Sequence, residues 1–305
     1  MNAWGPSTRG LRLLASVLSC AGIVQAQELE PRAYRALPTG LNFLVGAYQY
    51  SSGNVVFDGT APLEDLDIDI HTASLSYLRT FGLAGRSASV SFTAPRVQAA
   101  GSAEVAGARV SRSRSGWADA RLRLAVNLAG GPALSMQEFA KRRPGRTIGV
   151  GLTISVPTGQ YDPQYAVNFG ANRWGFKSEL GYSSVRRRWI LDSAVGVWLF
   201  TNNDDGPGGT TVRQDPIWSW QGHISYGFAN GMWLAFDLNY FYGGATAADG
   251  RETGATQSNS RAGLTWSIPI ATRHSLKLGG STGSYTRAGA DFDLATVAYQ
   301  YQWGR

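Results

Sequence analysis

The pattern of apolar and polar residues near the end of the chain repeats every two positions. Ala295, Val297, Tyr299, Tyr301 and Trp303 are apolar or aromatic, and polar residues lie between most of them. A period of two is typical of a β-strand with two different faces. In the wall of a transmembrane β-barrel, one face of each strand meets lipid, and the other lines a lumen that tolerates polar groups. The pattern therefore predicts a strand of such a barrel.

Similar alternation of apolar and polar residues recurs along the chain. The connections between these segments are alternately short and long. The segments are residues 41–50, 70–81, 88–94, 120–128, 148–156, 174–182, 189–199, 218–228, 234–242, 262–268, 276–280 and 295–303. An even number of strands places both termini and the short turns on the periplasmic side, and the long loops outside. We therefore expect an all-β fold, a transmembrane antiparallel up-and-down β-barrel of about twelve strands, formed by residues 27–305 as one domain.

One connection, residues 130–146, is longer than the short turn expected at its position. Its residues Ser135 and Glu138 have the spacing of a capping box, which predicts a short helix. Two interpretations of this helix stay open. It plugs or pads the periplasmic mouth, or it is a docking site for a periplasmic partner through Lys141, Arg142 and Arg143.

The first 26 residues have the features of a secretory signal peptide. Arg9 and Arg12 precede an apolar run, and the small-residue pattern that ends at Ala26 is a cleavage site. The only cysteine, Cys20, lies in this segment, so lipoprotein-type cleavage there is the alternative. Cleavage after Ala26 leaves a mature chain without a thiol, which excludes disulfides and cysteine-ligated metals. We expect localisation to the bacterial cell outer membrane, with insertion by the barrel-assembly machinery.

Composition supports a strand-built membrane protein and changes the expected partners. The sequence has no apolar run of about 18 residues, the length that a spanning helix needs. Charged residues make up 16% of the chain, and the mean hydropathy is -0.17. The formal net charge of +7 is not gathered on an element that docks to nucleic acid, so we expect no nucleic-acid partner. The expected partners are outer-membrane lipid, lipopolysaccharide and small solutes.

The phase of each predicted strand identifies the side chains that point into the lumen, where a function would be carried. Charges inside a barrel are hydrated or paired, because unpaired burial is costly. Two interpretations follow: a network of salt bridges that fills the lumen, or a selective lining with a cationic bias. The candidate substrate-binding or lumen-lining residues, with Asp119 beside them, are Arg121, Arg123, Arg173, Lys177, Glu179, Asp192, Gln221, His223, Asp237, Asn239, Arg261 and Lys277.

Signals for catalysis and for metal binding lack the context that they need. Residues 279–283 match the nucleophile-elbow pattern, but that elbow requires a strand followed by a helix. No serine is clearly paired with His71, the histidine expected near the outer rim and facing outward. The acidic residues of the outer loops lack the spacing of a calcium loop. We therefore expect no enzyme, no catalytic residue, no metal and no cofactor. The arginines that could contact lipopolysaccharide phosphates are Arg109, Arg112 and Arg114.

Several short motifs occur in order across most of the expected mature chain. They are residues 115–119 (Ser-Gly-Trp-Ala-Asp), 156–162 (Val-Pro-Thr-Gly-Gln-Tyr-Asp), 172–177 (Asn-Arg-Trp-Gly-Phe-Lys), 201–204 (Thr-Asn-Asn-Asp), and 231–234 (Gly-Met-Trp-Leu) running into 242–244. With these motifs the chain resembles the family named for the MetA pathway of phenol degradation. The resemblance implies an outer-membrane, porin-like channel for passive uptake of small hydrophobic or aromatic compounds. The alternatives are a structural or adhesion-type barrel with a plugged lumen and, more remotely, a barrel hydrolase.

Overall fold

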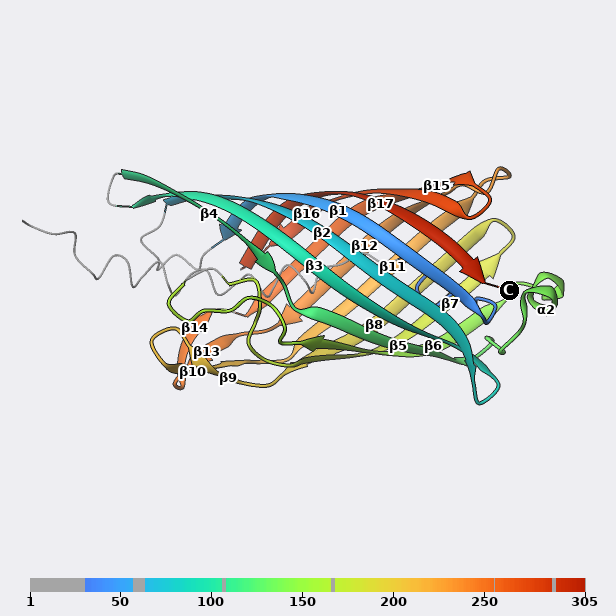
Figure 1. The fold of residues 1–305 in the computed structure, drawn as a ribbon, viewed down its shortest axis with the longest axis horizontal. Coiled ribbons are helices and arrows are strands. Elements are labelled where there is room, and N and C mark those ends of the chain that lie inside the picture. Colours follow the sequence, from blue (N-terminus) through green and yellow to red (C-terminus); the bar gives the residue numbers. More distant parts are fainter. Residues whose placement is uncertain are drawn as a thin grey trace, which may run out of the picture.

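The computed structural model describes residues 31–56, 64–105, 108–165, 168–254, 256–286 and 289–304. The predicted signal peptide, with Cys20, lies outside these residues. The chain forms a closed antiparallel barrel with twelve strand positions (Figure 1), as the alternation predicted. No helix in the described part of the chain has the length and apolar character to cross a membrane.

The strands of the barrel follow one another around the wall, and pairing of the first with the last closes it. They are β1 (Leu41–Val56), β2 (Glu64–Leu83), β3 (Arg86–Val105), β4 (Ala108–Trp117), β5 (Ala120–Ala129), β6 (Arg146–Val156), β7 (Gly175–Arg186), β8 (Trp189–Phe200), β11 (Ile217–Gly227), β12 (Trp233–Gly243), β15 (Gln257–Ala271), β16 (His274–Thr286) and β17 (Gly289–Gly304). Strands β4 and β5 pair with successive parts of the same edge of β3, so together they fill one position.

The two faces of the wall differ as the period of two requires. On β12, the side chains of Leu234, Phe236 and Leu238 are exposed on the outside. Their neighbours Asp237 and Asn239 have exposed fractions of only 0% and 2%. Apolar side chains on the outer face suit contact with lipid, and polar side chains on the inner face contact one another in the lumen. On this strand the apolar side chains therefore lie outside and the polar side chains inside.

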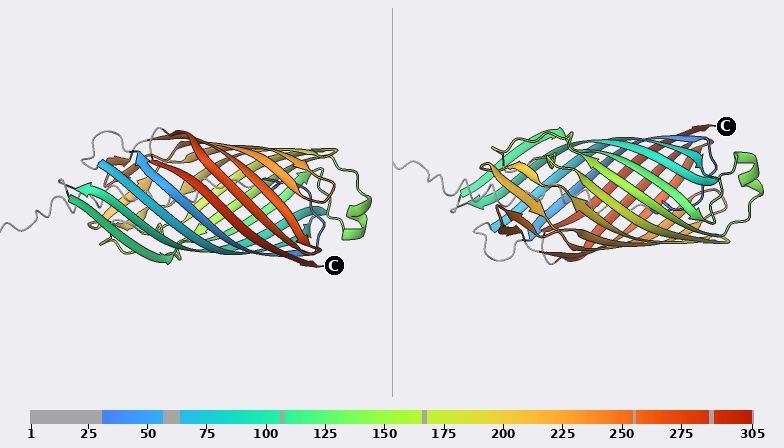
Figure 2. Two further views of the ribbon diagram at one scale, coloured as in Figure 1. Left: turned by 90° about the horizontal axis from the view of Figure 1, so that it is seen from above. Right: turned by 90° about the horizontal axis from the view of Figure 1, so that it is seen from below.

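The two ends of the barrel carry different structures (Figures 1 and 2). At the end with the long loops, β9 (Asn203–Gly206), β10 (Thr210–Gln214), β13 (Thr246–Ala248) and β14 (Arg251–Gly254) form a separate four-stranded sheet. At the other end lie the short turns, the C-terminus and helix α2 (Met136–Lys141). Because short turns of such barrels are periplasmic, we call this the periplasmic end.

Helix α2 begins with the predicted capping box. The backbone N–H of Ser135 donates to Oε2 of Glu138 over 2.8 Å, and the backbone N–H of Glu138 donates to Oγ of Ser135 over 3.3 Å. These bonds to Ser135 lower the pKa of Glu138. No residue of the helix is buried, and the helix lies beyond the strand ends. The helix therefore lies at the periplasmic mouth without entering the lumen, and padding of the mouth and docking of a partner both stay predictions.

The lumen is instead occupied at its periplasmic end by residues 31–40, which we call the N-terminal segment. No pattern in the sequence indicates this position of the N-terminal segment. Tyr34 is almost fully buried, and its hydroxyl reaches Glu179 on β7. The carbonyls of Leu37 and Pro38 accept hydrogen bonds from Ser87 and Thr80 on the adjacent wall. The N-terminal segment is thus bonded to the barrel at several points.

Candidate functional site in the barrel lumen

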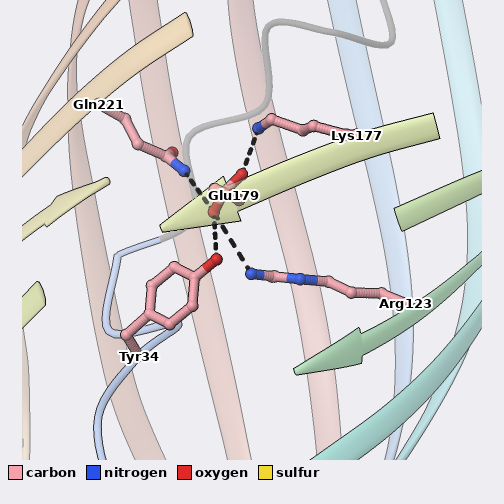
Figure 3. Close-up of polar contacts among 5 residues, drawn as sticks. All are labelled: Tyr34, Arg123, Lys177, Glu179 and Gln221. Carbon is pink, nitrogen blue, oxygen red and sulfur yellow. Dashed lines mark hydrogen bonds and ion pairs between the residues drawn. The ribbon is translucent and has the colours of Figure 1, made fainter. Parts of the chain in front are cut away.

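The carboxylate of Glu179 lies at the centre of a polar network inside the barrel (Figure 3). Its Oε1 accepts hydrogen bonds from the Tyr34 hydroxyl at 2.7 Å, from Gln221 Nε2 at 3.3 Å and from Arg123 Nη2 at 3.5 Å. Its Oε2 lies 2.5 Å from Nζ of Lys177. The donors come from β5, β7, β11 and the N-terminal segment. Two cations and two neutral donors compensate the buried charge, which would otherwise be strongly destabilising.

The ring of Tyr34 packs on inward-facing glycines of β6 and β7. A Cβ atom at Gly181 would lie 2.1 Å from the ring, and one at Gly149 would lie 2.9 Å from it. At Gly151 a Cβ atom would come within 2.8 Å of the Tyr34 hydroxyl. The guanidinium carbon of Arg123 lies 5.3 Å from the ring centroid, a distance at which a cation attracts an aromatic face. The wall therefore provides a recess shaped for one side chain of the N-terminal segment.

A second polar group crosses strands β8, β11 and β12. Asp192, His223 and Asp237 are register partners on these neighbouring strands, and all three are buried. His223 Nδ1 lies 2.7 Å from Asp237 Oδ1, and Thr265 donates to the other oxygen of Asp237. The backbone N–H of Arg32 donates to Asp192 over 3.2 Å. This row therefore provides another contact between the wall and the N-terminal segment.

The remaining predicted lumen residues are Arg261, Lys277, Asn239, Arg121 and Arg173. Arg261 donates to Ser281 Oγ and to the carbonyl of Phe292. Lys277 Nζ lies 5.9 Å from the Trp233 ring, whose centroid is 4.2 Å from the Arg32 guanidinium. Asn239 is buried on β12, Arg121 is half-buried on β5, and Arg173 donates to Gln214 among the outer loops. Burial lowers the pKa of Arg173 to about 10.

An apolar cluster, which no pattern in the sequence indicates, occupies the inner face of the wall near the outer loops. Trp198, Ile217 and Phe241 are at most 6% exposed, and Phe200 packs against them. The rings of Trp198 and Phe200 are stacked, with centroids 6.0 Å apart. Trp198 Nε1 is buried and has no hydrogen-bond partner among the described residues. The cluster thus combines closely packed aromatic rings with one buried, unused donor.

Two of the motifs that carry the family resemblance are joined by Asp119, which follows the end of β4. Its Oδ1 accepts a hydrogen bond from the backbone of Gly159 at 2.9 Å, and its Oδ2 accepts one from Ala171 at 2.8 Å. Burial raises the pKa of this carboxyl, although both bonds oppose the change. Gly159 and Gly170 lie so close that a Cβ atom on Gly159 would be 2.5 Å from Gly170 Cα. Asp119 therefore holds together the two parts of the outer connection that contain Gly159 and Ala171.

Replacing Asp119 with asparagine should loosen this outer connection. The amide NH₂ group of asparagine would face a backbone N–H, so one buried donor loses its acceptor, at a cost of about 1 to 3 kcal/mol. Limited proteolysis of the folded protein should then cut residues 157–174 faster than in the wild type. Asp215→Asn changes an exposed carboxyl in another outer loop and should leave the cleavage rate unchanged. Equal rates in the wild type and Asp119→Asn would contradict this role.

The sequence signals for catalysis do not gain support. Ser281, at the centre of the elbow-like pattern, lies inside β16 between two paired strands and not at a turn into a helix. His71 is paired with Tyr48, whose hydroxyl lies 2.6 Å from Nδ1. Within the described residues no group of three or more His, Cys, Asp or Glu could hold a metal ion. Of the outer-loop arginines, Arg114 lies 3.8 Å from the Tyr165 ring centroid.

The closed twelve-stranded wall has the fold of an outer-membrane channel. Residues 46–299 match the family described as "Putative MetA-pathway of phenol degradation", and the chain belongs to this family. Among solved structures, it is similar to an outer-membrane channel from Pseudomonas putida (21% identity, TM-score 0.77), over 90% of this chain and 100% of that one. It also resembles the transport unit of the autotransporter AIDA-I from Escherichia coli (9% identity, TM-score 0.52), over 94% and 98% of the two chains. No curated protein matches the sequence.

Proposed function

We propose that the protein is an outer-membrane channel for the passive uptake of small hydrophobic or aromatic compounds. The apolar cluster of Trp198, Phe200, Ile217 and Phe241 is the observation that carries the proposal. It places aromatic rings on the inner face of the wall close to the outer loops, where a solute from outside would first meet the half-buried ring of Phe200. The family and the barrel fold support the channel, and the cluster supports the class of solute.

The chemistry of the cluster fits a flat apolar solute that carries one oxygen. Aromatic rings prefer stacked or edge-on contacts with other rings, at centroid distances of 4.5 to 7 Å. The Nε1–H of Trp198 is buried and unused, so it can donate to a hydroxyl or carboxylate oxygen of a solute that displaces the packing of the cluster. An alkane has no oxygen to accept this hydrogen bond. Phenols and aromatic carboxylates should therefore be retained better than alkanes of similar size.

The groups in the rest of the lumen restrict the passage of water-soluble molecules. The N-terminal segment lies in the lumen between the periplasmic end and the network around Glu179, about midway along β7. The cations Arg123 and Lys177 both contact Glu179, which favours the salt-bridge interpretation for these two residues. In this proposal, passage toward the periplasm requires the N-terminal segment to shift.

Removing one aromatic side chain from the cluster should slow the uptake of an aromatic probe. Cells that express the wild type should take up N-phenyl-1-naphthylamine faster than cells with an empty vector, because lipopolysaccharide otherwise excludes this probe. Trp198→Ala should lower the initial rate severalfold, since it removes both stacking surface and the indole donor. The rise in probe fluorescence on mixing measures the rate.

The matched control is Trp218→Ala, which removes an outward-facing indole with 60% of its surface exposed. It should keep the wild-type rate, provided that both variants reach the membrane folded, as judged by faster migration on unboiled gels. A wild-type rate equal to that of the vector would refute uptake of this class. That result would favour the alternative, which is a structural barrel closed by the N-terminal segment. The burial of Tyr34 in the lumen supports this alternative.

A further inference from the structure

Basic side chains gather at one place on the periplasmic rim of the barrel. Strand β7 ends at Arg186, the turn consists of Arg187 and Arg188, and β8 begins at Trp189. Arg146 starts the neighbouring strand β6. Four of the arginines of the chain therefore lie within three adjacent strands at the same end.

The alternation of β7 and β8 places the rim residues on the outer surface of the wall. Arg186 and Trp189 are register partners, and Trp189 has 55% of its surface exposed. On the same face, further from the rim, Leu180 and Leu191 are about half exposed. Arg186, Arg187 and Trp189 line a shallow pocket. The pocket is thus at the edge of the lipid-facing surface and not in the lumen.

Aromatic rings mark the depth of this pocket in the membrane. Trp189 contacts Tyr226 on β11 edge-on, with centroids 4.9 Å apart, and Tyr226 contacts Phe228 in the same way at 5.1 Å. The Tyr226 hydroxyl lies 3.5 Å from Nη1 of Arg188. Girdles of aromatic residues lie at the membrane–water interfaces of such barrels, at the level of the lipid headgroups. Arg186 and Arg187 are therefore at headgroup height.

The charge of the rim is not compensated by the protein. In the described part of the chain, Arg146, Arg186 and Arg187 make no side-chain hydrogen bond or ion pair. Among the described turns and connections of this end, Glu138 is the only acidic residue, and it is held by Ser135. Guanidinium groups bind phosphate oxygens through paired N–H donors, more strongly than they bind neutral acceptors.

We propose that Arg186, Arg187 and Trp189 form a binding site for the phosphate headgroup of an anionic glycerophospholipid in the periplasmic leaflet. The arginines take the phosphodiester, the Trp189 ring covers the glycerol region, and the acyl chains run along Leu180 and Leu191. Arg146 adds positive charge beside the site. The proposal rests only on the barrel spanning a membrane, and not on what passes through its lumen.

The test uses the purified, folded protein in detergent micelles. Native mass spectrometry measures the apparent Kd for palmitoyl-oleoyl phosphatidylglycerol and for phosphatidylcholine with the same chains. The wild type should prefer phosphatidylglycerol about 25-fold, since each of the two arginines near the surface contributes on the order of a fivefold gain in affinity. The double variant Arg186→Gln/Arg187→Asn should lose most of this preference.

The control is the double variant Arg143→Gln/Arg273→Asn, which removes two other exposed cations of the same end. It has the same net charge as the first variant and should keep the wild-type preference. Equal losses in the two variants would show general charge attraction and overturn the site, as would a wild type without preference. Binding of glycerol 1-phosphate as tight as that of the lipid would also overturn it, because the site would then serve a free phosphate ester. Faster migration on unboiled gels checks that each variant is folded.

Discussion

Replacing Leu124 or Leu152 with arginine is expected to lower the free energy of unfolding of the barrel by about 2 to 4 kcal/mol. The two leucines are register partners on β5 and β6, and both are about 40% exposed on the outer face. They lie near the middle of their strands, so an arginine there would enter the hydrocarbon region and lose hydration. Denaturant unfolding in lipid micelles, followed by tryptophan fluorescence, measures the loss.

The inward-facing neighbours of these leucines provide the control. Ala125 and Thr153 follow them in sequence and point to the lumen side, where polar groups are accepted. Ala125→Ser and Thr153→Ser should cost less than about 1 kcal/mol each. Similar losses of unfolding free energy at the inward and outward positions would mean that the two faces of these strands have the same environment. That result would contradict the placement of the barrel wall in a membrane.

The membrane-facing part of the fold could be predicted from the sequence because lipid imposes a rule on it. Most side chains that face lipid are apolar, so the period of two is visible in most strands where they cross the bilayer. Leu234, Phe236 and Leu238 on β12 show this rule, and they are outward in the structure. The capping box of α2 could be predicted for a similar reason, because it depends on residues three apart.

The hairpin of β3 and β4 shows where this rule ends. Residues 108–117 were predicted as a loop, because serines and arginines alternate there without an apolar face. They form a strand that pairs with β3 from Arg96 to Val105. Beyond the membrane both faces of a strand are in water, so the pattern of apolar positions disappears while the backbone pairing continues.

The contents of the lumen could be predicted only in part. The facing of Arg123, Lys177 and Glu179 follows from the strand phase, but their contacts depend on Tyr34, which is 145 residues away from Glu179 in sequence. The recess for Tyr34 is made by the absence of side chains, and an inward glycine has no pattern of its own. The apolar cluster around Trp198 departs from the rule of a polar inner face, so alternation alone could not identify it.

The recess in the wall leads to the second large effect, which concerns the N-terminal segment. Replacing Gly181 with valine should drive Tyr34 out of the lumen, because a Cβ atom at this position would already lie 2.1 Å from the ring. Loss of Tyr34 removes a hydrogen bond to Glu179 and the packing on β6 and β7. With the segment displaced, the periplasmic half of the lumen gains free cross-section, and ion conductance in planar bilayers should rise severalfold.

The matched control is Gly279→Val on β16. A Cβ atom there would meet only ordinary contacts at 3.8 Å, so the added volume should leave the conductance near that of the wild type. Protease treatment separates the two mechanisms by which conductance can change. Residues 31–40 should be cleaved in the folded Gly181→Val protein and stay protected in Gly279→Val. If conductance rises while residues 31–40 still resist the protease, the barrel has widened with the N-terminal segment in place. That result would contradict the role of the segment as the obstruction of the lumen. A Gly181→Val protein that conducts no more than the wild type, and whose residues 31–40 resist the protease, would give the opposite answer. The strands, and not Tyr34, would then move to make room for the valine.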